Sequence, residues 1–298
     1  MCGIVGLFLK DDSLSPSLGS LMSDMLVTMT DRGPDSAGIA IYGAAQDDQF
    51  KITVQSKDPE LSFAGLEKHL NQVLNISCSV ESKSTHAVIS VSGDNAQAVE
   101  DHIRSGHEDL RIMATGEAME IYKEVGLPKD VSARFVVSQM GGTHGIGHTR
   151  MATESAITTL GAHPFSTGSD QCLVHNGSLS NHNSLRRKLK REGVRIETEN
   201  DTEVAAAYLT YRMNQGRNLG EALEDSLEDL DGFFTFVVGT KNGFGVLRDP
   251  IACKPAVMAE TDQYVAFGSE YRALVSLPGI DNANVWEPEP ANVYFWER

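Results

Sequence analysis

The most constraining feature of this 298-residue chain is a cysteine at its second position, placed directly before an apolar segment. Methionine aminopeptidase removes Met1 when the next side chain is small, so we expect the mature chain to begin with Cys2. A free α-amine titrates near ~8, so at neutral pH it is a usable base on the same residue as a strong nucleophile. Gly3–Leu9 is expected to form a short strand behind it. Cys2 therefore has both the thiol nucleophile and the amine base of a catalyst, and it needs no histidine partner. A small residue directly after Met1 also occurs by chance, so this position alone does not establish catalysis.

The charge of the chain argues against nucleic acid as a partner. The sequence has 25 Lys and Arg against 41 Asp and Glu, a formal net charge of −16. Phosphate binding needs a basic face, and the densest basic run, 186–191, is expected on the solvated face of a helix. No apolar run approaches the ~18–20 residues that span a bilayer, and no basic segment or cleavage site indicates a signal peptide. We therefore expect no membrane segment and a cytoplasmic protein.

The four cysteines, Cys2, Cys78, Cys172 and Cys253, are widely separated and show no CxxC spacing. This pattern favours reduced thiols in the cytoplasm. It argues against a zinc site or an iron–sulfur cluster within the chain. We therefore expect neither a metal nor a cofactor in this chain.

Periodicity and turn signals predict many strands with helices packed outside them. The expected strands span residues 3–9, 37–42, 145–150, 172–175, 233–239, 244–247, 256–259, 264–268 and 292–296. The expected helices outside the middle region span 17–30, 181–192, 201–213 and 219–230. Residues 44–142 differ, with helices expected at 59–74, 95–104 and 117–125 and a strand at 85–91. This composition favours a small α/β insertion over a linker.

Six short motifs follow one another along the chain: CGIVG at 2–6, DRGPDSAGI at 31–39, GHTRMAT at 147–153, AHPF at 162–165, VHNG at 174–177 and NDTE at 200–203. Together they resemble the class II glutamine amidotransferases, N-terminal-nucleophile hydrolases that take ammonia from glutamine. The resemblance runs from position 2 to about 275, with 44–142 outside it. It implies an α+β fold, a four-layer αββα sandwich of two antiparallel sheets between helices. One amidotransferase domain would then cover 2–298, with an α/β segment inserted at 44–142.

The resemblance implies that the chain hydrolyses L-glutamine by acyl transfer. The Cys2 thiolate attacks the amide carbon, an oxyanion forms, ammonia leaves and water cleaves the thioester, while the Cys2 amine carries the proton. The oxyanion needs preorganised donors, each worth roughly 3–4 kcal/mol when removed. By resemblance these are the Asn176 side chain and the Gly177 backbone N–H. Taken alone, Asn-Gly at the end of a strand is also typical of a turn.

The same resemblance assigns residues to the recognition of free glutamine. Arg150 suits the α-carboxylate because a guanidinium binds it through two parallel hydrogen bonds, and Asp201 suits the α-ammonium. In isolation, Arg150 would be an ordinary surface arginine and Asp201 an ordinary helix cap. Arg32, Thr153 and His163 are carried over as further pocket residues, His163 in a structural rather than a catalytic role.

Two competing site hypotheses fail on geometry. His144 and His148 have a spacing that suits a metal on a helix, but the Gly-Ile-Gly between them argues against a helix. On a strand the two histidines lie roughly 13 Å apart. A Cys-His pair that uses Cys172 lacks the local signature of papain-like enzymes.

One departure from the family pattern concerns the acceptor of the ammonia. Glucosamine-forming relatives usually have an aromatic residue after the arginine and a histidine four places after it. This chain has Met151 and Glu154 at those positions. The change bears on the lid and on the coupling to a synthase, not on Cys2.

The amidotransferase pattern uses nearly the whole chain, so we expect a separate synthase subunit docked over the pocket in a hetero-oligomer. Segments at 149–158, 161–165 and 113–117 look like the stand-alone amidotransferase subunits of glutamate-synthase-like complexes, N-methylglutamate synthase in particular. Such complexes carry FMN and iron–sulfur clusters on other subunits, in agreement with the cysteine count here. The insertion 44–142 is then either the docking surface or a surface elaboration.

Two alternatives remain open. One is a class II amidotransferase that feeds another acceptor, of phosphoribosyl or amino-sugar type. Co-purifying partners separate it from the first hypothesis, because a flavin-yellow complex favours the glutamate-synthase-like assembly. The other is a non-catalytic scaffold subunit of a synthase complex. The joint presence of Cys2, Arg150, Asn176 and Asp201 argues against a scaffold, which has no need of all four.

Overall fold

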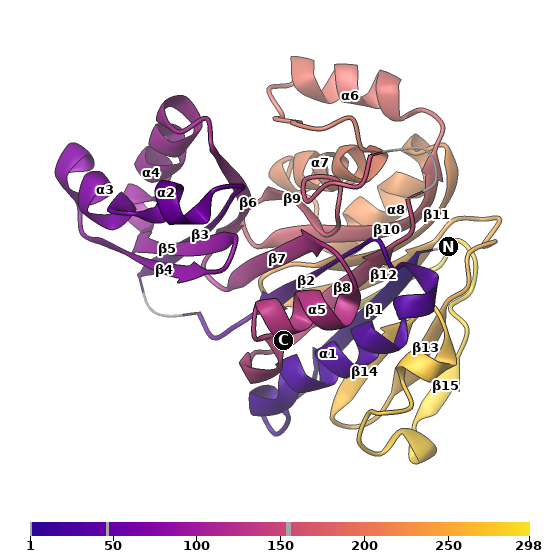
Figure 1. The fold of residues 1–298 in the computed structure, drawn as a ribbon. Coiled ribbons are helices and arrows are strands. Elements are labelled where there is room, and N and C mark those ends of the chain that lie inside the picture. The colour runs from indigo at the N-terminus through magenta and orange to yellow at the C-terminus, as the bar shows by residue number, and fades with distance from the viewer. Residues whose placement is uncertain (1, 46–47, 153–155) are drawn as a thin grey trace.

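The computed structural model describes residues 2–45, 48–152 and 156–298. Two antiparallel sheets are stacked face to face, with helices outside each of them, and a smaller unit projects from one side (Figure 1). This arrangement is the four-layer αββα sandwich that the motifs implied. The central strands are buried along their whole length, because each sheet packs one face against the other sheet and one against helices.

The first sheet has the order β15-β13-β14-β1-β8-β2-β7, and β1 lies at its centre. All seven residues of β1 are buried, which a strand needs when it is covered on both faces. The strands of this sheet are β1 (Gly3–Leu9), β2 (Ser36–Tyr42), β7 (Met119–Val125), β8 (His144–Arg150), β13 (Val257–Glu260), β14 (Tyr264–Gly268) and β15 (Asn284–Trp286).

The second sheet has the order β16-β12-β11-β10-β9 and packs against the first. Its strands are β9 (Phe165–Gly168), β10 (Gln171–Leu179), β11 (Gly232–Gly239), β12 (Gly243–Arg248) and β16 (Val293–Glu297). Ile4 and Phe8 of β1 share one buried cluster with Val174, Val237 and Phe244 of the second sheet. At Gly6 the sheets approach so closely that an added Cβ would lie 2.8 Å from the Phe244 ring.

Helices cover the two outer faces of the sandwich. The helices α1 (Leu18–Thr28) and α5 (Pro128–Arg134) pack on the first sheet. The helices α6 (His182–Arg191), α7 (Asp201–Asn214) and α8 (Leu219–Asp229) lie on the side of the second. Short 3-10 turns complete the body: η1 (Ser15–Ser17), η2 (Thr30–Arg32), η3 (Val137–Gln139), η4 (Tyr271–Ala273) and η5 (Ile280–Asn282).

The projecting part, which we call the inserted unit, spans residues 49–116 and has a core of its own. Its sheet has the order β4-β5-β3-β6, and its helices are visible at the left of Figure 1. The elements are β3 (Gln49–Ser56), α2 (Pro59–Phe63), α3 (Leu66–Leu74), β4 (Cys78–Lys83), β5 (His86–Ser92), α4 (Gly93–Gly106) and β6 (Leu110–Gly116). An α/β insertion is therefore present, but it is shorter than the predicted 44–142.

The boundary differs because the predicted helix at 117–125 is a strand. Met119–Val125 forms β7 and pairs with β2 over seven residues, which places it in the main sheet. Met119 and Ile121, two positions apart, join the core between the sheets. The following helix α5 packs against α1, so this stretch also belongs to the sandwich. The predicted helix at 59–74 is divided in two at Gly65, whose φ of +71° is left-handed.

Across the part of the chain that the structure describes, every helix is too short or too polar to cross a membrane.

Candidate active site

Cys2 lies directly before β1, and its backbone is held by two other segments. Its carbonyl oxygen accepts a hydrogen bond from Arg32 Nε at 3.0 Å and another from Asn176 Nδ2 at 3.1 Å. The side chain is half-buried, with Sγ 3.9 Å from the Met151 carbonyl oxygen. The thiol is therefore located by its backbone, and within the described residues the sulfur lies at long range from Met151.

The start of β1 is fixed by contacts that require a small residue at position 3. Gly3 N donates to Thr149 Oγ1 at 3.2 Å, and that hydroxyl donates to the Met29 carbonyl oxygen. An added Cβ at Gly3 would lie 2.8 Å from both neighbouring side chains. On the other side, Ile4 N donates to Ser269 Oγ at 2.9 Å. The glycine after Cys2 is thus a packing requirement. Thr149 belongs to the motif at 147–153, whereas Ser269 is a site residue that lies in none of the motifs.

Asn176 and Gly177 lie inside strand β10, not in a turn. Asn176 pairs with Thr235 and Gly177 with Phe234 of β11, and the ladder continues to Leu179. Asn176 is buried, and its amide reaches Cys2 across the space between the sheets. Gly177 has a φ of +149°, and a Cβ there would lie 2.0 Å from the Phe233 carbonyl oxygen. The turn interpretation of this dipeptide is therefore wrong, and glycine is needed at position 177 for steric reasons.

Arg32 is a buried residue of η2 that joins Cys2 to an acidic side chain. Its Nη1 lies 2.5 Å from Glu270 Oε1, while its Nε bonds the Cys2 carbonyl. The hydrogen bond from Arg32, aided by the charge of Arg272, holds the pKa of Glu270 below its usual range. Glu270 was not found from the sequence because it follows β14 and belongs to none of the motifs. Its only sequence signal is the strand that precedes it.

Arg150 ends strand β8 at the position next to the Thr149–Gly3 pair, which places its backbone beside Cys2. It is 7% exposed, so the interpretation as an ordinary surface arginine is wrong. Its Nη1 donates to the Ala156 carbonyl oxygen at 3.3 Å. Asp35 holds the segment after β8, because its Oδ2 accepts a hydrogen bond from Ala152 N at 2.8 Å. Thr153, the other pocket candidate in this motif, lies outside the described residues.

Asp201 is the first residue of α7 but not its cap. Asn200 caps the helix, with its side chain accepting from Thr202 N at 2.8 Å. Asp201 instead reaches β10, where Oδ2 accepts from Leu179 N at 3.0 Å and Oδ1 lies 3.8 Å from His175 Nδ1. The carboxylate is therefore positioned at the same strand that carries Asn176, and burial lowers the pKa of the His175 ring that Oδ1 approaches.

His163 lies in a buried group behind the site. Its Nε2 is 2.7 Å from Thr202 Oγ1, which is also 3.0 Å from His175 Nδ1. The ring stacks on His148 with centroids 4.1 Å apart. Burial lowers the pKa of His163 well below its usual value and that of His148 to about 3, so both rings are neutral. These contacts connect β8 and β10 to the start of α7, a supporting arrangement.

The competing sites find no support. His144 is buried on β8, with Nε2 2.9 Å from the Thr240 carbonyl oxygen, and burial lowers its pKa to about 3. Cys172 is buried between the sheets with Sγ 3.3 Å from the Tyr42 hydroxyl. Burial raises the pKa of the Cys172 thiol to about 12, so it stays protonated at neutral pH. Among the four cysteines, Cys2 and the exposed Cys253 remain open to reagents.

The arrangement around Cys2 is suited to attack on an amide. The thiol lies directly before β1, the Asn176 amide approaches from β10, and the buried Arg32 guanidinium binds the Cys2 carbonyl oxygen. Such donors stabilise negative charge that develops in a water-poor site.

Comparison with known proteins agrees with this chemistry. A family described as "Glutamine amidotransferase domain" matches residues 148–276. The chain is 68% identical to the glutamine amidotransferase-like protein GlxB of Rhizobium meliloti (strain 1021), over all of this chain and 99% of that protein. It is 33% identical to a putative glutamine amidotransferase of Methanothermobacter thermautotrophicus, over the full length of both.

Solved structures support the fold. Glutamine phosphoribosylpyrophosphate amidotransferase from B. subtilis superposes with a TM-score of 0.63 at 18% identity, covering 99% of this chain and 47% of that one. A structure described as the allosteric regulatory enzyme of purine biosynthesis gives a TM-score of 0.65 at 19% identity with the same coverage. At these identities the match concerns the fold alone.

Proposed function

The chain belongs to the class II glutamine amidotransferases, enzymes of the N-terminal-nucleophile type, and we propose that it hydrolyses L-glutamine at Cys2 and passes the ammonia to a partner synthase subunit. The observation that carries the proposal is the convergence on Cys2 of Arg32 and Asn176, which hold its carbonyl from two different parts of the sandwich. This placement leaves the sulfur at the surface of the site and brings an amide donor next to it.

The chemistry follows from these groups. The Cys2 α-amine, free once Met1 is removed, takes the thiol proton, and the thiolate attacks the side-chain amide carbon of glutamine. The tetrahedral oxyanion collapses, the carbon–nitrogen bond breaks, and ammonia leaves with the proton from the amine. Water then cleaves the thioester, which gives glutamate and returns the thiol.

Asn176 is suited to the oxyanion because its amide nitrogen carries two hydrogens. One bonds the Cys2 carbonyl oxygen at 3.1 Å, and the other is available to a substrate oxygen held beside the sulfur. The backbone N–H of Gly177 is the proposed second donor. Preorganised donors of this kind need no rearrangement when the charge develops.

Arg150 and Asp201 are the proposed recognition pair for the α-carboxylate and α-ammonium of glutamine. Arg150 is buried at the end of β8 with Nη1 donating to the Ala156 carbonyl oxygen, and Asp201 is held through Oδ2, which accepts from Leu179 N. Arg32 is already engaged by Glu270 and Cys2, so we assign it a positioning role. Thr153 and His163 remain proposed pocket residues, His163 as a support behind α7.

The partner that we propose is a synthase of glutamate-synthase-like or N-methylglutamate-synthase-like type, which would carry FMN and iron–sulfur clusters. Support comes from the sequence segments that resemble such subunits and from the exposed side chain of Met151, whose carbonyl contacts Cys2. Affinity purification of the tagged chain from its native host tests this part. A yellow flavoprotein should co-purify, and a partner without flavin would contradict it.

The glutaminase proposal is tested by labelling with 6-diazo-5-oxo-norleucine, a glutamine mimic that alkylates an active nucleophile. Peptide mass spectrometry should find the label on a peptide that begins at Cys2 without Met1, and excess L-glutamine should suppress it. Cys253 is the matched control, since it is the exposed thiol of the chain. Equal labelling of Cys2 and Cys253, unaffected by glutamine, would reject a glutamine site at Cys2.

A further inference from the structure

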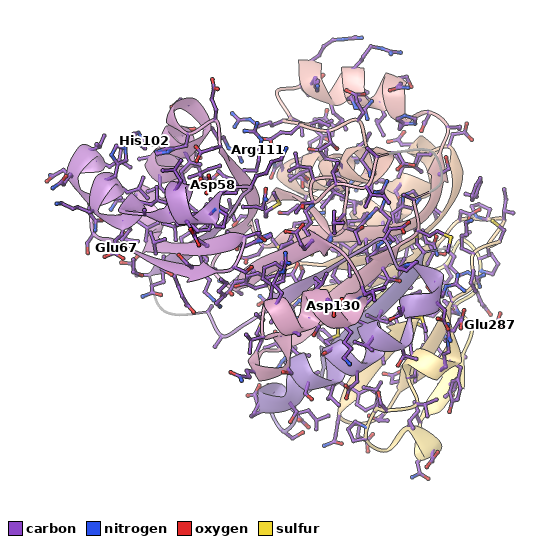
Figure 2. The ribbon with its side chains drawn as sticks, viewed as in Figure 1. Asp58, Glu67, His102, Arg111, Asp130 and Glu287 are labelled. Carbon is purple, nitrogen blue, oxygen red and sulfur yellow. The ribbon has the colours of Figure 1, made fainter. Side chains whose placement is uncertain are left out.

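Three histidines from separate segments of the inserted unit meet at one point on its surface. His69 belongs to α3, His102 to α4, and His107 directly follows α4. One ring nitrogen from each lies within 4.8 Å of the other two, and Nε2 of His69 is 3.2 Å from Nε2 of His102. Figure 2 shows His102 on the inserted unit, at the left of the view, well apart from β1 and β14.

The spacing is close to what a tetrahedral metal ion requires. Zinc–nitrogen bonds of about 2.0–2.1 Å at tetrahedral angles place two ligand nitrogens about 3.3 Å apart. The His69–His102 pair already has this separation. His107 needs a shift of about 1.5 Å or less to complete the set, a movement that side-chain rotation provides. Neutral imidazole is a common ligand of zinc and of its neighbours in the first transition row.

A second observation concerns the hydrogen bonding of the cluster. Nε2 of His107 is shielded from solvent and has no hydrogen-bond partner among the described residues. A shielded ring nitrogen without a partner is costly unless something binds it. The three rings pack at nearly equal distances, with centroids 5.3–5.4 Å apart.

The cluster also stands out among the nine histidines of the chain. Five of them are buried in the body of the fold: His86, His144, His148, His163 and His175. Of the remaining four, three form the cluster, and the fourth, His182, contacts the Leu179 carbonyl oxygen on the sandwich. Packing alone does not require these three histidines to converge from α3, from α4 and from the residue that follows α4.

We propose that His69, His102 and His107 bind one divalent transition-metal ion, with Zn²⁺ as the expected occupant and a solvent-facing fourth position. The ion would clamp α3 to the end of α4. That end of α4 also carries Arg104, whose Nη1 lies 2.6 Å from Glu197 on the sandwich, so metal binding would stiffen the contact between the inserted unit and the body. The site was not expected from the sequence, because His69 and His102 lie 33 positions apart and no local motif joins them.

Calorimetric titration of the chelator-treated full chain with Zn²⁺ tests the proposal. To keep the catalytic thiol from binding zinc, the titration uses a Cys2→Ser background. One equivalent of Zn²⁺ should bind, and Mg²⁺, which prefers oxygen ligands, should not. Loss of an outer-sphere partner alone weakens metal sites roughly 10–100-fold. We therefore expect His102→Gln to weaken Zn²⁺ binding by at least about 100-fold.

The matched control is His182→Gln, which removes the other accessible histidine and should leave Zn²⁺ binding unchanged. If His102→Gln does not fold by circular dichroism, His69→Gln replaces it, because His69 is exposed. Zn²⁺ should also raise the Tm of the parent chain but not of the histidine variants. No binding, or binding that survives the cluster substitutions, would overturn the proposal.

Discussion

At the scale of single residues, the site is built by holding the backbone of Cys2 while leaving its sulfur accessible. Arg32 and Asn176 bind the same carbonyl oxygen, and Gly3 N is fixed by Thr149. A fixed backbone keeps the sulfur correctly oriented while the thiol is converted into a thioester. The acidic partner Glu270 pairs with Arg32 Nη1 and orients the guanidinium toward Cys2.

Replacement of Asn176 by alanine tests the oxyanion role. We expect kcat for glutamine hydrolysis to fall roughly 10²–10³-fold, because one preorganised donor is lost, with a much smaller change in KM. Asn214→Ala, at the exposed end of α7, is the control and should keep parental kinetics. Steady-state glutaminase assays measure both. An unchanged kcat in Asn176→Ala would remove this residue from the mechanism.

Lys123 predicts a pH dependence of stability. It is buried on β7, with Nζ donating to the Ala162 and Pro164 carbonyl oxygens, and burial lowers its pKa to about 7. Unfolded lysine titrates near ~10.4, so between these values the unfolded chain binds more protons. Stability should therefore rise with pH from 7 to 10, by up to about 1.4 kcal/mol per pH unit.

Urea unfolding at pH 7.5 and pH 9 checks the effect of Lys123. Lys123→Met should lack this rise in the free energy of unfolding, since the titrating group is gone. Lys129→Met, at an exposed position of α5, should retain it. A parental slope that persists in Lys123→Met would mean that another group is responsible.

At the scale of elements, β10 shows how pairing overrides local preference. Its predicted extent was 172–175, whereas the strand spans Gln171–Leu179 and pairs with β11 at eight positions. Asn-Gly favours a turn in isolation, but the ladder and the core on both sides keep it extended. Asn176 consequently faces Cys2 in the space between the sheets.

Gly177 should not tolerate a side chain. In Gly177→Ala the new Cβ would meet the Phe233 carbonyl oxygen at 2.0 Å, at a φ of +149°. We expect a loss of roughly 3–5 kcal/mol in the free energy of unfolding. Gly193→Ala, at a φ of +84° with nothing within 4 Å of the added Cβ, should cost only about 1–2 kcal/mol. Urea unfolding compares the two, and equal losses would contradict a steric role for Gly177.

At the scale of the whole molecule, the chain enters and leaves the inserted unit at one edge of the first sheet. It leaves after β2 and returns before β7, where Gly43 N donates to the Ala118 carbonyl oxygen at 3.0 Å. Its contact with the body includes the Arg104–Glu197 ion pair and encloses a cavity of about 120 Å³. The unit has its own core, while Met113 and Ala114 of β6 also pack in the core between the two sheets. We therefore expect the sandwich to fold without the unit, with a moderate loss of stability.

Excision of the inserted unit tests this independence. Replacing residues 44–117 with Asn-Gly should convert β2 and β7 into a hairpin, because Gly43 and Ala118 already pair. We expect a folded sandwich by near-UV circular dichroism, with a loss of roughly 2–3 kcal/mol, or roughly 4–12 °C in Tm. Labelling at Cys2 should persist. A variant without a cooperative transition would show that the unit is part of the core fold.

The same variant tests whether the inserted unit docks the partner subunit. If it does, the excised chain should keep glutaminase labelling but fail to recover the partner in a pull-down. Unchanged recovery would identify the unit as a surface elaboration.

The sequence by itself determined the nucleophile candidate, the order of the motifs and the layered sandwich, and it located α1, α6, α7 and α8 within about two residues. These features depend on neighbouring residues, through hydrophobic periodicity, turns and helix ends. Only the tertiary structure decided that 119–125 is a strand, that Glu270 pairs with Arg32, and that His69 meets His102 and His107. Each of these depends on contacts between segments distant along the chain. The pairing of strands and the packing of helices bring such segments together, and no local pattern encodes their meeting.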